Sequence, residues 1–219
     1  MSKDVVSGDQ NWAYSEKVKD HFFNPRNFLN EEPPAGQFDA QGQVGSLACG
    51  DIMSIWLKID PDQDRIVDLK WRTFGCASAI AATSVFSEMV LKNGGLTIEE
   101  AIKISPSDIM AELGGLPARK VHCSVLADKA FRQTLNNYFR IRGQHNRIIT
   151  DGSRVIDPDL KITEQEVVEV IHQGAQTLEE IQARLKVGVG RPEVKAEIEK
   201  LIEKHRGQES KPFCPRQKP

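Results

Sequence analysis

The sequence predicts an α+β fold in which a small antiparallel sheet covered by helices is followed by a small all-α module. Two runs of alternating apolar and polar residues, 53–59 and 67–71, predict the sheet, and the turn-forming segment 61–64 separates them. From residue 76 onward, apolar residues recur at intervals of three and four, which predicts helices. The 219 residues exceed the commonest domain length of roughly 100–150, so one full domain plus a smaller unit is expected.

The first element expected along the chain is a short helix. Tyr14, Val18 and Phe22 are spaced four residues apart, and the pair Asn24-Pro25 should end this helix. Residues 30–43 contain proline and glycine and are expected to form a connection. The antiparallel hairpin then follows, with one face toward water.

Cys76 is expected at the switch from the second strand to the next helix. Apolar residues over 79–89 recur at helical spacing, and glycines after Asn93 should end that helix. Two short helices should then begin, one at the capping-box pattern of Thr97 and one at Ser105, where proline takes the first helical position.

A longer helix is expected from about Arg119 to Arg140, because its apolar residues keep to one broad stripe. Cys123 therefore falls in the first turn of this helix. Residues 142–158 show no period and carry the turn signals Asp151-Gly152 and Asp157-Pro158, which indicate a boundary.

The chain therefore divides into four parts. They are a first domain over 1–145, a linker over 146–160, a helical module over 161–206 and a disordered tail over 207–219. Within the module, Thr163 and Thr177 open capping-box helices, and a glycine-bearing loop at 188–192 leads to a third helix. The tail is polar and proline-rich, a composition typical of disorder.

Composition argues against two classes of partner. The 29 basic and 31 acidic residues give a net charge of -2. The chain therefore has no overall positive charge that would favour binding to nucleic acid or to an anionic membrane. No apolar run approaches the roughly 20 residues of a membrane span, and the first residues lack the pattern of a secretory signal. We therefore expect a cytoplasmic protein whose four cysteines are thiols.

Cys49, Cys76 and Cys123 form the one constellation with chemical content. Asp51 lies two residues after Cys49, and His122 directly precedes Cys123. Thiolates with a carboxylate and an imidazole suit zinc or an iron–sulfur cluster, because soft sulfur selects these metals. The helix starts at Cys76 and Cys123 favour the thiolate, which serves either as a metal ligand or as a nucleophile.

The residues alone leave simpler interpretations open. A single cysteine of this kind is about as often a buried core residue as a functional one. Taken singly, His122 is more often a hydrogen-bonded histidine than a ligand, and Asp51 more often a turn residue. The spacing also lacks the paired C-x-x-C form that identifies many zinc sites.

Four segments in order resemble the iron–sulfur scaffold family of IscU and the N-terminal domain of NifU. They are Tyr14-Ser15-Glu16-Lys17-Val18 with Asn24-Pro25-Arg26-Asn27, Ala48-Cys49-Gly50-Asp51, Phe74-Gly75-Cys76-Ala77-Ser78-Ala79-Ile80-Ala81, and Lys120-Val121-His122-Cys123-Ser124-Val125-Leu126-Ala127. The resemblance covers residues 12–141. It implies a scaffold for iron–sulfur cluster assembly, which is not an enzyme, with the family fold of an antiparallel sheet covered by helices.

The resemblance also implies roles for single residues. Cys49, Cys76 and Cys123 match the ligand cysteines, Asp51 matches the acidic residue that tunes cluster lability, and His122 matches the histidine beside the last cysteine. These five residues are the implied metal ligands.

The implied cycle involves two protein partners. A cysteine desulfurase delivers persulfide sulfur to Cys123, with Lys120 assisting, and iron joins it. A labile [2Fe-2S] or [4Fe-4S] cluster then passes to an acceptor protein. Three thiolates with an oxygen or nitrogen fourth ligand hold a cluster more loosely than four thiolates, and they also accept zinc.

The sequence departs from the family in two places. The segment that reads Leu-Pro-Pro-Val-Lys in the IscU branch, where an Hsp70-type chaperone binds it, is here Leu116-Pro117-Ala118-Arg119-Lys120, which argues against that partner. Residues 155–204 resemble the BFD module of NifU, which holds a cluster on four cysteines. The matching positions here are Asp157, Asp159, Arg191 and Val194. Because these side chains cannot replace thiolates, we expect a degenerate, cluster-free module for docking or dimerisation.

Two other functions remain open from the sequence. One is a zinc-bound sulfur-transfer protein, which accepts persulfide without building a cluster. The other is a structural zinc domain that works through its C-terminal helices. Cys214, in the tail, is expected to be an incidental exposed thiol, with an extra mobile ligand or a sulfur acceptor as the alternative. The sequence leaves a homodimer open.

Overall fold

The computed structural model describes residues 14–46, 51–116, 122–150, 152–188 and 190–205. Its centre is a three-stranded antiparallel sheet with the strand order β1-β2-β3, and a second sheet consists of a small hairpin, β4-β5. The strands are β1 (Ala40–Ser46), β2 (Asp51–Asp60), β3 (Arg65–Phe74), β4 (Val155–Asp157) and β5 (Ile162–Thr163). The α+β class expected from the sequence is confirmed.

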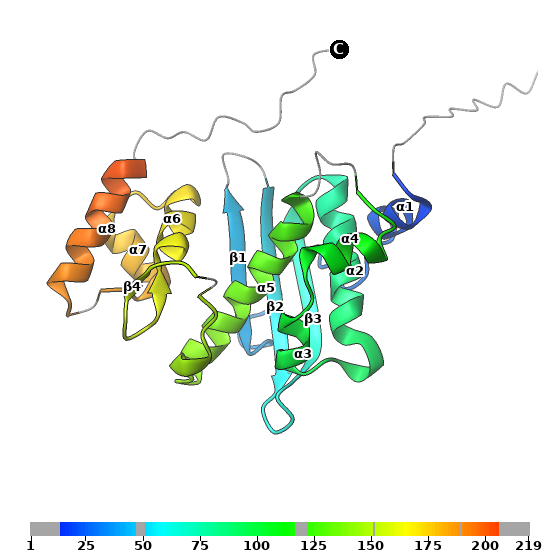
Figure 1. The fold of residues 1–219 in the computed structure, drawn as a ribbon, viewed down its shortest axis with the longest axis horizontal. Coiled ribbons are helices and arrows are strands. Elements are labelled where there is room, and N and C mark those ends of the chain that lie inside the picture. The colour runs from blue at the N-terminus through cyan, green and yellow to red at the C-terminus, as the bar shows by residue number, and fades with distance from the viewer. Residues whose placement is uncertain (1–13, 47–50, 117–121, 151, 189, 206–219) are drawn as a thin grey trace, which may run out of the picture.

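Helices lie over one face of the large sheet, and three further helices form the C-terminal module beside β1 (Figure 1). The helices are α1 (Glu16–Phe23), α2 (Ala77–Leu91), α3 (Ile98–Ile102), α4 (Pro106–Glu112), α5 (His122–Ile141), α6 (Glu164–His172), α7 (Leu178–Leu185) and α8 (Pro192–His205), with short 3₁₀ turns η1 (Lys92–Gly94) and η3 (His145–Arg147). None of the described helices is long and apolar enough to cross a membrane.

Strands β2 and β3 follow the expected alternation. Met53, Ile55 and Leu57 are buried under the helices, and the residues between them face the other side. Trp56 is an exception on that second face, because only 6% of it is exposed and its indole N–H donates to Gln41 Oε1 at 3.1 Å. The second face is therefore not wet over its whole length.

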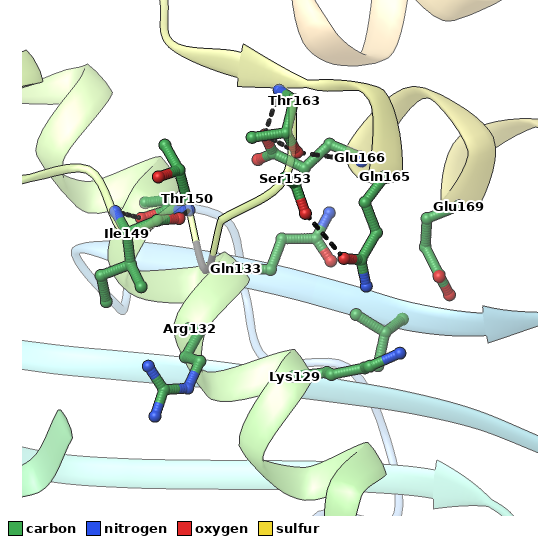
Figure 2. A pocket seen from close by; sticks show the side chains of 12 residues that line it. Lys129, Arg132, Gln133, Ile149, Thr150, Ser153, Thr163, Gln165, Glu166 and Glu169 are labelled. Atoms are coloured by element: carbon green, nitrogen blue, oxygen red, sulfur yellow. Dashed lines mark hydrogen bonds between the residues drawn. The ribbon is translucent and has the colours of Figure 1, made fainter. Parts of the chain in front are cut away.

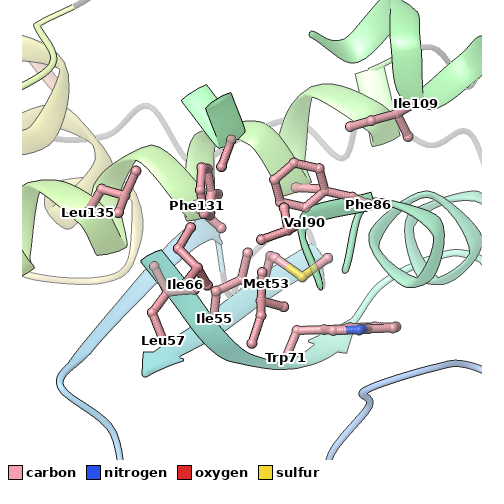
Figure 3. Close-up of a cluster of buried hydrophobic side chains, with 14 of the residues drawn as sticks. Met53, Ile55, Leu57, Ile66, Trp71, Phe86, Val90, Ile109, Phe131 and Leu135 are labelled. Carbon is pink, nitrogen blue, oxygen red and sulfur yellow. The ribbon is translucent and has the colours of Figure 1, made fainter. Parts of the chain in front are cut away.

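The first core lies between the sheet and helices α2 and α5 (Figure 3). Phe86 of α2 and Phe131 of α5 meet edge to face, with ring centroids 5.1 Å apart. Trp71 of β3 is fully buried, and its indole N–H donates to Arg26 O at 2.8 Å. Each such aromatic side chain stabilises the fold by roughly 1.5–3 kcal/mol through burial.

Helix α5 lies directly on the backbone of β1. A Cβ added to Gly42 would stand 2.5 Å from Thr134 Oγ1 and 2.7 Å from the Thr134 backbone nitrogen. No side chain fits in that space, so glycine at this position permits the close approach of helix and strand.

Two segments differ from the sequence-based expectation. Residues 30–43 were expected to form a connection, but β1 already begins at Ala40. Its sequence, AQGQVGS, is rich in glutamine and glycine, so no apolar alternation indicates a strand. The 146–160 segment, expected as a linker, contains β4, which is too short to show a period.

The second core belongs to the C-terminal module. Its buried residues come from the β4-β5 hairpin and from α6, α7 and α8: Ile156, Ile162, Val167, Val170, Ala175, Ile181, Val187, Val194, Ile198 and Leu201. The capping boxes expected at Thr163, Thr177 and Thr97 are present, and the helix start expected at Ser105 also has one.

Candidate functional site

The strand register places three chain segments at one end of the sheet. Ser46, the last residue of β1, pairs with Asp51, the first residue of β2. The next residue of β2, Ile52, pairs with Phe74, the last residue of β3. Thr73 reinforces this end, because its hydroxyl donates to Ile52 O at 2.6 Å. Asp51 and the chain that leaves β3 toward Cys76 therefore lie at the same end.

Cys76 occupies the N-cap position of α2, as the switch from strand to helix predicted. Its carbonyl oxygen accepts hydrogen bonds from Ala79 N at 2.9 Å and Ile80 N at 3.1 Å. The residue is partly exposed. The positive end of the helix dipole favours an anion here, which suits a thiolate that binds metal or attacks sulfur.

Helix α5 begins at this same end of the sheet (Figure 1). His122 and Cys123 are its first two residues, so the first-turn placement of Cys123 is confirmed. The backbone therefore brings together the strand ends at Asp51, the helix start at Cys76 and the helix start at His122. Residues scattered over 72 positions of the chain share one end of the domain, which is the arrangement that a common metal site requires.

Of the five expected ligands, only Cys76 has a side chain that the structure describes; the other four lie partly or wholly outside the described residues. This holds for the whole of Cys49 and for the side chains of Asp51, His122 and Cys123. Residues 117–120, which include Lys120 and most of the segment compared with the chaperone-binding motif, and Cys214 in the tail also lie outside. Among the described side chains, no three of the histidine, cysteine, aspartate or glutamate type gather as a metal site.

A hydroxyl pair beside Cys76 has no counterpart in the sequence analysis. Ser78 in the first turn of α2 is fully buried, and its hydroxyl donates to the Tyr14 hydroxyl at 3.0 Å. Tyr14 entered the sequence analysis only through its helical spacing and its family match. The two residues are 64 positions apart, so no local pattern could reveal the contact.

Arg72 and Phe74 give this end of the sheet its exposed surface. Phe74 is 61% exposed, and the Arg72 guanidinium carbon lies 5.0 Å from the centre of its ring. Such cation–π contacts are weak when exposed, about 0.5–1 kcal/mol. The contact holds the positive charge of Arg72 at this end of the sheet, three residues before Gly75 and four before Cys76.

The structure also brings together the four module positions that the sequence analysis matched to cluster cysteines. The Asp157 carboxylate accepts hydrogen bonds from Asp159 N at 3.0 Å and from Gly188 N at 2.9 Å. Arg191 forms an ion pair with Asp159 at 2.6 Å. Val194 is buried beside Gly188, where an added Cβ would stand 3.2 Å from Val194 Cγ1. The three polar side chains are thus paired by hydrogen bonds or an ion pair, and Val194 is packed in the interior.

The chain matches one known family over most of its first domain. Residues 13–145 match the family described as "NifU-like N terminal domain". Chains with this similarity include Nitrogen fixation protein NifU of Nostoc sp., which is 35% identical over 195 residues, a match that covers 87% of this chain and 63% of that protein. The chain thus spans less than two thirds of this relative's length.

Two shorter relatives are covered more completely. Iron-sulfur cluster assembly scaffold protein IscU 1 of Archaeoglobus fulgidus is 47% identical over 135 residues, which cover 62% of this chain and 82% of that protein. The scaffold protein IscU of Aquifex aeolicus is 39% identical over 155 residues, which cover 71% of this chain and 92% of that protein. Since the family match spans more than half of the sequence, the chain belongs to the family of the NifU-like N-terminal domain.

Proposed function

We propose that the protein is a scaffold on which an iron–sulfur cluster is assembled, held and passed to acceptor proteins. One observation carries the proposal: the backbone brings the start of β2, the start of α2 and the start of α5 to one end of the sheet. The relatives named as NifU and IscU scaffold proteins support it. In this role the protein is a carrier, and the cluster is its cargo.

The proposed ligands of the cargo are Cys49, Cys76 and Cys123, with Asp51 or His122 completing the set. Thiolates are the ligands that hold iron–sulfur clusters, and the two helix starts favour the anionic form. A carboxylate or imidazole in the fourth position weakens the hold relative to a fourth thiolate. A scaffold needs this, because it must release what it binds.

Sulfur is proposed to arrive from a cysteine desulfurase as a persulfide. The Cys123 thiolate attacks the terminal sulfur of the desulfurase persulfide, a new S–S bond forms on Cys123, and the desulfurase leaves as a thiolate. Reduction of that sulfur to sulfide takes two electrons from an external reductant. Lys120 is proposed to assist at this step through its positive charge.

Anaerobic reconstitution tests this function. The apo protein is incubated with ferrous iron, L-cysteine, a desulfurase and dithiothreitol, and visible absorption, iron and acid-labile sulfide are measured. We expect sulfur-to-iron charge-transfer bands and equal amounts of bound iron and sulfide. Replacing Cys49, Cys76 or Cys123 by serine should abolish them, whereas Cys214→Ser, the matched control, should leave them unchanged.

The other outcomes identify the alternatives. Persulfide on Cys123 together with tight zinc, but no bound sulfide, would indicate a zinc-bound sulfur-transfer protein. Cysteines that bind zinc and do not react with the desulfurase would indicate a structural zinc domain. Either result would contradict the scaffold function.

Asp51→Ala should lengthen the life of the reconstituted cluster. The carboxylate is proposed to keep the cluster labile, as the family resemblance implies for this acidic residue, so its removal should slow the loss of the cluster. The decay of the visible bands after addition of an iron chelator measures this life, and we expect it to rise severalfold. Asp62→Ala, in the turn between β2 and β3, is the control. An unchanged or shorter life would contradict the role of Asp51.

The C-terminal module is proposed to be a degenerate, cluster-free copy of the BFD module. The proposal is supported by the residues at the four matching positions, where the polar side chains bond to one another and to the backbone. These residues are Asp157, Asp159, Arg191 and Val194. Expressed alone, residues 152–219 should therefore reconstitute no cluster. A stable [2Fe-2S] spectrum from that fragment would contradict the proposal.

A further inference from the structure

Strand β1 is an edge strand of the described sheet, yet side chains meet its outer edge. Three alternate residues of β1 make these contacts. Asn137 Nδ2 of α5 donates to Gln41 O at 2.8 Å, and Nε2 of Gln173, the C-cap residue of α6, donates to Gln43 O at 3.0 Å. The backbone N–H of Gly45 donates to Glu169 Oε1 of α6 at 2.6 Å. Helix α6 thus takes the place that a further strand would occupy.

Of these three hydrogen bonds, the one at Gly45 belongs to the strongest type. Its acceptor is a carboxylate, and hydrogen bonds to an ionised partner are shorter and stronger than neutral ones. Gly45 has a φ of 114°, a conformation that residues other than glycine rarely adopt. Glu169 therefore fixes an unusual backbone conformation one residue before β1 ends. Figure 2 shows its side chain directed from α6 toward the strand.

Helix α6 is anchored well enough to act as a fixed support. Arg140 of α5 forms an ion pair with Glu166 of α6 at 2.9 Å, and each side chain is only 12% exposed. Arg140 Nε also donates to Leu160 O at 3.0 Å. Glu166 in turn accepts from Thr163 N at 2.9 Å as part of the capping box that begins α6. The start of the helix is thereby tied to α5.

The pocket beside Glu169, between β1, α5 and α6, is small. Its cavity volume is about 70 Å³, far below the several hundred cubic ångströms of an organic ligand site. Glu169, Glu166 and Val44 line it, together with polar residues of α5 (Figure 2). The space suits ordered water, so the pocket itself indicates no ligand.

We propose that Glu169 is a positioning residue for the candidate site, acting through the end of β1. This proposal rests on the proposed function. Ser46, the residue after Gly45, pairs with Asp51, one of the proposed ligands. By fixing Gly45, the C-terminal module holds the backbone of the strand end against which Asp51 is placed. The module thus takes part in metal binding without supplying a ligand, as outer-shell residues do at other metal sites.

The test compares Glu169→Ala, Glu169→Gln and the control Glu199→Ala in the full chain. Glu199 is an exposed glutamate on α8. Hydrogen exchange of the peptide 40–46 is followed by mass spectrometry, and Co²⁺ alone is titrated as the metal probe. We expect exchange at Gly45 to be about tenfold faster in Glu169→Ala, and Co²⁺ binding to be about tenfold weaker. Glu169→Gln, which keeps an oxygen acceptor, should lie between it and the wild type, and the control should match the wild type.

Each other result has a defined meaning. Unchanged exchange in Glu169→Ala would overturn the proposal, and so would faster exchange with unchanged Co²⁺ affinity. If Glu169→Ala fails to fold, Glu169→Gln decides the question by the same two measurements. A wild-type chain that binds no Co²⁺ through its cysteines would contradict the proposed function itself, whereas the exchange data would still show whether Glu169 holds β1.

Discussion

The two cores of this chain use their polar residues in different ways. In the first domain, at the end of the sheet that carries the candidate site, Cys76 is partly exposed at a helix start and Phe74 is 61% exposed. In the C-terminal module, Asp157 is 3% exposed, and its carboxylate accepts backbone N–H groups from both sides of the module. One region keeps a thiol partly exposed at a helix start. The other uses its carboxylates to stabilise its own loops.

The carboxylates of the module serve the fold in two ways. Asp157 holds loops within the module, and other carboxylates hold the module against the first domain. The contacts between the regions fit this division: Glu166 and Glu169 of the module bond to α5 and β1 of the first domain. Variants that remove single contacts should therefore affect the two regions in different ways.

The largest effect is expected from Arg140→Ala, which breaks the ion pair between the two regions. The variant leaves Glu166 buried without its cation, so the free energy of unfolding should fall by roughly 3 kcal/mol. Denaturant unfolding followed by circular dichroism measures this change. The control is Arg184→Ala, an exposed arginine of α7, which should change stability by less than about 0.5 kcal/mol. Equal losses in the two variants would show that the regions are not coupled through this pair.

A smaller effect, confined to the module, is expected from Asp157→Ala. The variant removes the acceptor of the Asp159 and Gly188 N–H groups and should cost about 2 kcal/mol. Hydrogen exchange should rise in peptides from 155–205 and stay unchanged in β2 and β3. The control, Asp159→Ala, loses an exposed ion pair and should cost less than about 1 kcal/mol. Exchange that rises equally in both regions would contradict the separation of the cores.

The smallest effect is a pH dependence that each core contributes through one histidine. Burial and the nearby Arg26 guanidinium lower the pKa of His21 from its ordinary value of 6.5, and burial followed by the charge of His172 lowers the pKa of His205. Below pH 6.5 the unfolded chain binds a proton that the folded chain resists. The free energy of unfolding should therefore fall as the pH drops below 6.5 and stay constant just above it.

Substitution by glutamine separates the two contributions. His21→Gln should flatten more of this slope than His205→Gln, because His21 is 3% exposed and more deeply buried than His205. Unfolding free energies measured between pH 5 and pH 8 at roughly half-unit steps, across the range where histidine titrates, give the slopes. Slopes that stay the same in both variants would show that other groups carry the dependence.

The sequence predicts local features of this fold better than distant contacts. The capping boxes at Thr97 and Thr163 and the alternation around Ile55 are local signals, and the structure contains the elements they predict. Strand β1 has no such signal, because its polar and glycine residues form a strand only against β2 and α5. The cysteines could be proposed as ligands from residue type and family resemblance. Contacts such as Gly45 with Glu169, 124 positions apart, need the folded chain.

The close contact of α5 with Gly42 is a point about which a change in packing would tilt the helix. Thr134, the contact point, lies twelve residues after His122, so the first turn of α5 stands about 18 Å along the axis from that point. A tilt of only roughly 3° about Gly42 would therefore move the start of the helix by about 1 Å. A methyl group at position 42 would therefore shift the first turn of α5, which contains Cys123, although the substitution lies twelve residues along the helix from that turn.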